Sequence, residues 1–173
     1  MEASEEKRSE FVDAIRNIKE ENIVYIDESG IENNISKESG WGKKGKPIFC
    51  TKSGKYYKRT NIIAGITKGK IIAPFTFETM CNTEIFNLYI EKVLIKELRH
   101  GQVIVMDNAS FHKSKRSKEL IESVGCKILF LPPYSPDLNP IEKFWSKMKK
   151  WIRNKIENFV TLYDVIEAFF RAM

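Results

Sequence analysis

Two short apolar segments that each end on an aspartate constrain the fold of this chain more than any other sequence feature. They read IVYID at residues 23–27 and QVIVMD at residues 102–107. Apolar runs of this length are typical of buried strands. Strands followed by alternating helices and strands predict an α/β domain, a mixed sheet with helices on its faces. We expect further strands at 59–67, 70–77 and 126–131, and helices at 4–21, 83–99, 114–125, from 140 onward and at 161–172.

The chain is long enough to bury a core without disulfides or a structural metal. It has 173 residues, of which 42% are hydrophobic and 12% aromatic, and this composition excludes disorder as the main state. No apolar run has the length of a membrane span, and the charged start MEASEEKRSE lacks the apolar core of a signal peptide. We therefore expect a soluble, cytoplasmic protein without a membrane partner.

Basic side chains are concentrated in two blocks. Residues 41–70 carry nine basic and no acidic side chains, and residues 143–155 carry six basic and no acidic ones. The net charge of the whole chain is only +6, because the rest of it is acidic. Segregated positive charge favours a polyanionic partner such as a nucleic acid. Two solvated, lysine-rich surfaces are the alternative.

Three acidic side chains are candidates for a metal site. Asp27 and Asp107 end apolar strands, where an ionised carboxylate is costly unless a partner satisfies it. Glu142 begins a helix after the proline-dense loop LPPYSPDLNP, which can bring it to the same edge of the sheet. Carboxylates that lie close together repel one another, and their oxygens suit Mg²⁺ or Mn²⁺. Two such ions stabilise both the attacking and the leaving oxygen of a phosphoryl transfer.

Each acid also has a purely structural interpretation. Asp27 can begin a turn at Ser29-Gly30, and Asp107 can accept a hydrogen bond from the backbone two residues on. Asn139 is expected to cap the next helix, so that Glu142 can complete a capping box with it. The spacing alone leaves open whether the three acids meet.

Three sequence blocks resemble the signature blocks of the DDE transposases in the mariner-type superfamily, specifically its bacterial insertion-sequence branch. They are IVYIDESG (23–30), VIVMDNASFH (103–112) and LPPYSPDLNPIEKFW (131–145). Thirty-four residues separate Asp107 from Glu142, a spacing found across much of that group. The resemblance extends from about residue 10 to the C-terminus.

The resemblance implies a ribonuclease H-like fold with a mixed five-stranded sheet flanked by helices. It also implies that Asp27, Asp107 and Glu142 are the catalytic residues and hold two Mg²⁺ or Mn²⁺ ions. The implied reaction cuts the ends of a transposon and then joins the freed 3′-hydroxyl to target DNA. The implied partners are double-stranded DNA and a second copy of the chain, in a bacterial cytoplasm and close to the nucleoid.

Full-length relatives carry paired helix-turn-helix domains ahead of the catalytic domain. Residues 1–22 are too few for such a pair, and we expect them to form a helical leader that ends the linker to that missing half. Residues 23–173 are then the catalytic domain, with a basic, clamp-like insertion at about 30–58. A separately encoded helix-turn-helix half is the expected partner, and an excised piece or a decayed remnant are the alternatives.

Candidate DNA-contacting side chains come from both basic blocks, because lysine and arginine neutralise backbone phosphates. A subunit contact for the first block and a solvated helix face for the second are the alternatives. Asn108 and His112 are candidate accessory residues, and His112 is either a group that positions water or phosphate or a hydrogen-bonded structural residue. Trp145 is expected in the core. The candidate DNA contacts are Lys43, Lys44, Lys46, Lys58, Arg59, Lys147, Lys150 and Arg153.

Two other functions remain open at this point. One is a non-catalytic remnant that binds DNA or assists assembly through its basic surface, although three intact acids argue against it. The other is a structure-selective nuclease of the same fold. The insertion and the SPDLNPIE block favour a transposase over such a nuclease.

Overall fold

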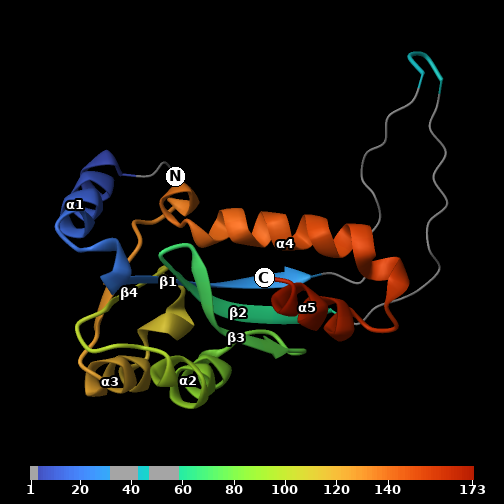
Figure 1. The fold of residues 1–173 in the computed structure, drawn as a ribbon. Coiled ribbons are helices and arrows are strands. Elements are labelled where there is room, and N and C mark those ends of the chain that lie inside the picture. Colours follow the sequence, from blue (N-terminus) through green and yellow to red (C-terminus); the bar gives the residue numbers. More distant parts are fainter. Residues whose placement is uncertain (1–3, 32–42, 47–58) are drawn as a thin grey trace.

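A five-stranded sheet with the order β3-β2-β1-β4-β5 forms the centre of the molecule (Figure 1). The computed structural model describes residues 4–31, 43–46 and 59–173. The strands are β1 (Ile23–Ile31), β2 (Thr60–Thr67), β3 (Lys70–Phe77), β4 (Val103–Met106) and β5 (Lys127–Phe130). The helices are α1 (Glu5–Arg16), α2 (Thr83–Lys92), α3 (Lys115–Ser123), α4 (Ile141–Lys155) and α5 (Leu162–Arg171).

The strand directions confirm the predicted mixed sheet. β1 runs antiparallel to β2, and β2 runs antiparallel to β3. On its other side β1 is parallel to β4, which is parallel to β5. The β2–β3 connection is the expected hairpin, in which Lys68 and Gly69 both have positive φ, 50° and 72°, as a tight two-residue hairpin requires.

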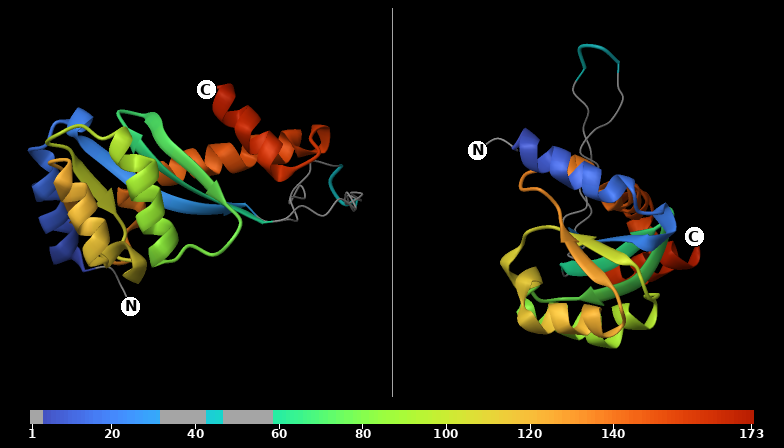
Figure 2. Two further views of the ribbon diagram at one scale, coloured as in Figure 1. Left: turned by 90° about the horizontal axis from the view of Figure 1, so that it is seen from below. Right: turned by 90° about the vertical axis from the view of Figure 1, so that its left-hand side faces the viewer.

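Helices cover both faces of the sheet, as Figure 2 shows from two further directions. On one face, residues of α4 and α5 pack on Ile62 and Ala64 of β2. On the same side, α1 packs through Phe11 against Val105 and Leu131. On the opposite face, residues of α2 and α3 pack on Val24 and Ile26 of β1 and on Ile63 of β2. Successive strand residues therefore enter different cores, because side chains alternate across a strand.

Several predicted helix boundaries are confirmed by their caps. Ser4 and Ser114 accept hydrogen bonds from the backbone at the first turns of α1 and α3. Thr161 forms a full capping box with Asp164 at the start of α5. Side-chain acceptors satisfy backbone N–H groups that a helix leaves unpaired at its beginning.

Other expected boundaries were wrong. β1 does not end at Asp27 but continues to Ile31, because Asp27–Ile31 pairs with residues 60–64 of β2. The helix expected at 4–21 ends at Arg16, and the one expected at 83–99 ends at Lys92, where Val93 leaves helical geometry (φ −122°, ψ −62°). The predicted insertion at about 30–58 lies mostly outside the described residues. Within it, residues 43–46 are described and form a turn.

Within residues 4–31, 43–46 and 59–173, we find no helix with the length and apolar character needed to span a membrane.

Candidate active site

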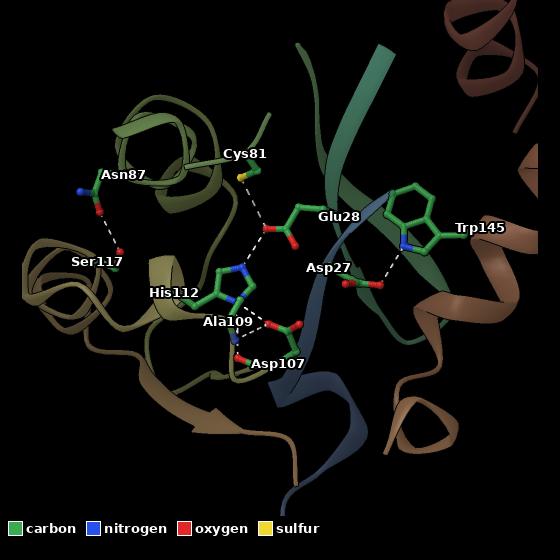
Figure 3. Close-up of polar contacts among 9 residues, drawn as sticks. All are labelled: Asp27, Glu28, Cys81, Asn87, Asp107, Ala109, His112, Ser117 and Trp145. Carbon is green, nitrogen blue, oxygen red and sulfur yellow. Dashed lines mark hydrogen bonds and ion pairs between the residues drawn. The ribbon is translucent and has the colours of Figure 1, made fainter. Parts of the chain in front are cut away.

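The pairing of β1 with β4 brings Asp27 and Asp107 together. Tyr25 pairs with Val105 in this parallel ladder, so residues two positions further along each strand lie at the same edge of the sheet. Asp27, Asp107 and Glu142 all line one cleft of about 380 Å³. Figure 3 shows Asp27 and Asp107 as neighbours between His112 and Trp145. The three acids singled out in the sequence therefore line the same cleft.

Glu142 reaches the cleft from α4. It is the second residue of that helix, and its side chain is exposed. The proline-rich segment 132–136 forms part of the cleft wall beside it. The expected N-cap at Asn139 is wrong, and the alternative capping box with Glu142 is absent. Pro140 holds the N-cap position without a side-chain capping bond, and Oδ1 of Asn139 is buried without a partner among the described residues.

Asp27 sits in an environment that resists its ionisation. Burial, followed by the negative charges of Glu28 and Glu142, raises the pKa of Asp27 from 3.8 to about 7. Nε1 of Trp145 donates a hydrogen bond to Oδ2 of Asp27 at 3.1 Å. This hydrogen bond lowers the pKa of Asp27 and so opposes part of the rise. The turn interpretation of Asp27 is wrong, because this residue lies within β1.

Trp145 is buried in the core as expected, and it also fixes the orientation of an active-site carboxylate. Its side chain is 2% exposed and packs against Phe144, with ring centroids 5.1 Å apart. It stands one turn after Glu142 on α4. The helix that supplies the third acid thus also supplies a hydrogen-bond donor to the first.

Asp107 has the opposite electrostatic environment. Its Oδ1 lies 2.6 Å from Nδ1 of His112 and accepts a hydrogen bond from the backbone N–H of Ala109 at 2.9 Å. The hydrogen bond with His112 is the main reason why the pKa of Asp107 is lowered. The backbone contact predicted from the sequence is therefore present, and it coexists with a position in the cleft.

His112 connects Asp107 to a residue that the sequence analysis missed, Glu28. The imidazole is fully buried, and its Nε2 lies 2.7 Å from Oε1 of Glu28 (Figure 3). Burial lowers the pKa of His112, but the hydrogen bonds to Asp107 and Glu28 outweigh it and raise the pKa to about 9. The charged imidazolium thus stands between two carboxylates.

Strand alternation explains why Glu28 was missed and how it can be found. Neighbouring residues of β1 point to opposite faces, so Asp27 meets Trp145 while Glu28 meets His112 on the side of α2 and α3. Sγ of Cys81 lies 3.9 Å from the same Glu28 oxygen, and burial together with this carboxylate raises the pKa of the thiol to about 12. The sequence feature that could have identified Glu28 is an acidic residue directly after Asp27, at a strand position that faces the core.

The segment that carries His112 is held in place by a polar network. Ser114 and Ser117 each donate to Oδ1 of Asn87 in α2, at 2.9 and 2.7 Å. The His112 ring packs on Phe86 of the same helix, with centroids 4.3 Å apart. Asn108 donates through Nδ2 to the carbonyl of Leu131, and it lines the cleft. These contacts tie the residues after β4 to α2 and to the end of β5.

Of the predicted DNA-contacting residues that the structure describes, none lines the cleft itself. Lys147, Lys150 and Arg153 are exposed on α4, whose first turn carries Glu142. Arg59 is exposed just before β2, and its Nε donates to Asn61 at 3.2 Å. Lys58 lies outside the described residues. The remaining three, in the turn at 43–46, are exposed: Lys43, Lys44 and Lys46.

The chemistry of the cleft fits a divalent cation. Carboxylate oxygens are the ligands that Mg²⁺ and Mn²⁺ prefer. The charges that oppose ionisation of Asp27 come from other carboxylates, and a cation relieves that repulsion. In the described part of the chain, no group of three or more acidic, histidine or cysteine side chains is arranged so that it could hold a metal ion.

Comparison with known families identifies the family of the chain. The model of the DDE superfamily endonuclease family matches residues 22–163. Because the match covers most of the chain, the chain belongs to this family. The resemblance to DDE transposases of the mariner type is confirmed, and the bacterial branch stays a prediction.

Curated relatives include two nematode transposases. The Tcb2 transposase of Caenorhabditis briggsae is 37% identical over 71 residues, which are 38% of this chain and 26% of that protein. The Tc3 transposase of Caenorhabditis elegans is 28% identical over 109 residues, 61% of this chain and 33% of that protein. An uncharacterised protein of Sinorhizobium fredii is 30% identical over 79 residues, 44% of this chain and 56% of that protein. The chain thus spans between about a quarter and just over half of these relatives.

Solved structures of the Mos1 transposase share the fold. The pre-cleavage Mos1 transpososome superposes with a TM-score of 0.75 at 17% identity, over 96% of this chain and 54% of that chain. The catalytic domain of the Mos1 mariner transposase gives a TM-score of 0.65 at 14% identity, over 99% and 82% of the two chains. The expected ribonuclease H-like fold is thereby confirmed.

Proposed function

We propose that this chain is the catalytic domain of a DNA transposase, which cuts transposon ends and joins the 3′-hydroxyl to target DNA. The observation that carries the proposal is the convergence of Asp27, Asp107 and Glu142 on one cleft. Its support from relatives is the family match and the Mos1 neighbours, whose solved forms include a strand transfer complex and catalytic domains with Mg or Mn.

The three carboxylates would hold two divalent ions, Mg²⁺ or Mn²⁺. When bound, such ions supply an activated nucleophile and neutralise charge on the phosphate undergoing transfer. In the cutting step, a water oxygen bonds to phosphorus and the 3′-oxygen leaves with a proton. In the joining step, that 3′-hydroxyl attacks a target phosphodiester and a second 3′-oxygen leaves, so the number of phosphodiester bonds is unchanged.

The chain's own residues fix the carboxylates in two different ways. Trp145 donates to Asp27 and holds it on the α4 side of the cleft. Ala109 and His112 both contact Oδ1 of Asp107, which restricts rotation of that carboxylate. Positioning the reacting groups in advance removes an entropic barrier from the reaction.

The exposed basic residues supply the DNA contacts in this proposal. Lys147, Lys150 and Arg153 would contact the phosphate backbone on the helix that carries Glu142, and the basic block around residues 43–59 would extend that contact. The proposed assembly is a homodimer on double-stranded DNA, with a helix-turn-helix half, encoded separately, that recognises the transposon ends. A cytoplasmic site of action near the nucleoid follows from such a substrate.

The test is metal-dependent cutting of transposon-end DNA with the helix-turn-helix half supplied in trans. We expect nicking in Mg²⁺ or Mn²⁺, none in EDTA, and a loss of at least a thousandfold in Asp107→Asn. Asp13→Asn, an exposed carboxylate on α1, is the matched control and should retain full activity. Wild-type nicking by Asp107→Asn would refute the assignment.

The same reaction separates a transposase from a nuclease. A labelled supercoiled target added to the mixture should acquire the donor 3′-end if the chain catalyses joining. Cutting without joining, with all components present, would indicate a structure-selective nuclease instead.

A further inference from the structure

Three adjoining hollows lie between the active-site cleft and the edge of the sheet. The cleft shares Asn108, Leu131 and two prolines with a second hollow of about 540 Å³ between α1 and β5. That hollow shares Lys113 and Phe130 with a third hollow of about 600 Å³, which α3 and β5 border. The three hollows adjoin one another through these shared residues and follow one another from the carboxylates to the edge strand β5.

Lysine side chains dominate the third hollow, which we call the lysine groove. Lys113, Lys115, Lys118 and Lys127 line it, and Glu122 is the acidic residue among its described lining residues. All four lysines are exposed. They come from three different elements, namely the turn after β4, α3 and the start of β5, and the fold gathers them in one place.

Most of the charge of this groove is available to a ligand. Lys113 lies in the field of Asp107 and contributes to lowering the pKa of that carboxylate. Lys115 and Lys118 lie 3.7 and 3.8 Å from glutamates one helical turn ahead in α3. Exposed pairs of this kind are weak, because solvent screens them and both side chains are flexible. A phosphate can therefore displace them.

The floor of the lysine groove is apolar. Ile128 and Phe130 line it, and Nζ of Lys113 lies 5.6 Å from the centre of the Phe130 ring. Lysines beside an aromatic ring suit a nucleic-acid strand, since the cations neutralise phosphates while the ring contacts bases or sugars.

We propose that the lysine groove binds the phosphate backbone of the DNA strand that leaves the active-site cleft. The strand passes over Asn108 and Lys113 and crosses the edge of the sheet to Lys118 and Lys127. This inference rests on the proposed function, because the shared walls connect the groove to the cleft where that function places the reacting phosphodiester. The groove adds a DNA contact on the side of the sheet opposite α4.

The experiment measures DNA binding without catalysis. Binding of a fluorescently labelled duplex of arbitrary sequence is followed by anisotropy in EDTA over a range of salt concentrations. We expect the triple variant Lys113→Gln/Lys118→Gln/Lys127→Gln to lose about three from the slope of log K against log salt, and on the order of a hundredfold in affinity at about 0.15 M salt. The matched control removes the same charge from exposed lysines that line none of the three hollows and lie outside both basic blocks, Lys19, Lys92 and Lys96.

A second readout locates the contact. Bound duplex should protect Lys113, Lys118 and Lys127 from acetylation, as measured by mass spectrometry, and should leave the control lysines reactive. An unchanged salt slope in the groove variant, an equal loss in the control variant, or absence of protection would each overturn the inference. Because no step requires cutting, an inactive wild type with the expected lysine effects would refute the proposed function and leave the DNA groove standing.

Discussion

Replacing Asp27 by asparagine should stabilise the protein while abolishing its proposed activity. In the metal-free protein the carboxylate of Asp27 is held by burial beside two other acids, and its pKa is raised from 3.8 to about 7. The folded state therefore binds a proton that the unfolded state has already lost between these two pH values. Stability falls as the pH rises through this window, because folding then requires an unfavourable charge in the cleft.

The size of the effect follows from the pKa values. A difference of one in pKa corresponds to about 1.4 kcal/mol, so the ionised Asp27 lowers the free energy of unfolding by at most about 4 kcal/mol above pH 7. Asparagine has no charge and keeps an oxygen that can accept the hydrogen bond from Trp145. The variant should match the wild type near pH 4 and exceed its stability by up to about 4 kcal/mol at pH 8.

The assay is urea unfolding in EDTA at pH 4, 6 and 8, with Asp13→Asn as a control. Asp13 is an exposed acid on α1, 3.7 Å from Arg16, and its replacement should change the free energy of unfolding by less than about 0.5 kcal/mol. Adding Mg²⁺ should stabilise the wild type by about 1.4 kcal/mol at ten times its Kd, and should stabilise Asp27→Asn much less. The electrostatic account of the cleft is wrong if Asp27→Asn is no more stable than the wild type at pH 8. It is also wrong if the difference in free energy of unfolding between the two proteins is the same at pH 4 as at pH 8.

Two further substitutions test the side chains that hold the carboxylates. Trp145→Phe keeps the aromatic packing but removes the hydrogen-bond donor to Asp27. The pKa of Asp27 should therefore rise further, and the free energy of unfolding should fall by about 1.5–3 kcal/mol at pH 8. NMR titration measures the pKa and urea unfolding measures the stability, and an unchanged pKa would count against the hydrogen bond. His112→Ala leaves the partly buried Glu28 without its cation and should lower the free energy of unfolding by about 3 kcal/mol near neutral pH. Since the pKa of His112 is raised from 6.5 to about 9, its stabilisation is complete below pH 6.5 and is lost as the pH rises through 9. The difference in free energy of unfolding between the wild type and His112→Ala should decrease above that pH. A constant difference from pH 6 to 10 would contradict the ion pairs of His112.

Local patterns in the sequence were enough to predict most strands and several caps. A run such as 102–107 is apolar, short and bounded by polar residues, and those properties depend only on neighbouring positions. Boundaries were less predictable. β1 continues through Ser29-Gly30 because β2 offers hydrogen-bond partners there. The side chain of Arg59 packs against Gly30, and a Cβ at this position would lie only 2.7 Å from Nη2 of Arg59. Pairing with a distant strand outweighed the local turn signal.

The convergence of the three acids was predictable in part. Asp27 and Asp107 stand at equivalent places on two strands, so adjacent parallel pairing suffices to bring them together. The position of Glu142 depends on how the proline-rich segment crosses the end of the sheet, and the resemblance to the family supplied that expectation. The expected N-cap was wrong, because Pro140 rather than Asn139 occupies the N-cap position of α4.

The sequence by itself determined which residues are acidic, which strands are apolar and where the basic blocks lie. The tertiary structure decided the partners of each charge. The hydrogen bond between Trp145 and Asp27 spans 118 residues, and the contact between His112 and Glu28 spans 84. The lysine groove likewise joins side chains from three separate elements. Such contacts depend on the packing of helices against a sheet whose neighbours are far apart in the chain, and no local periodicity encodes them.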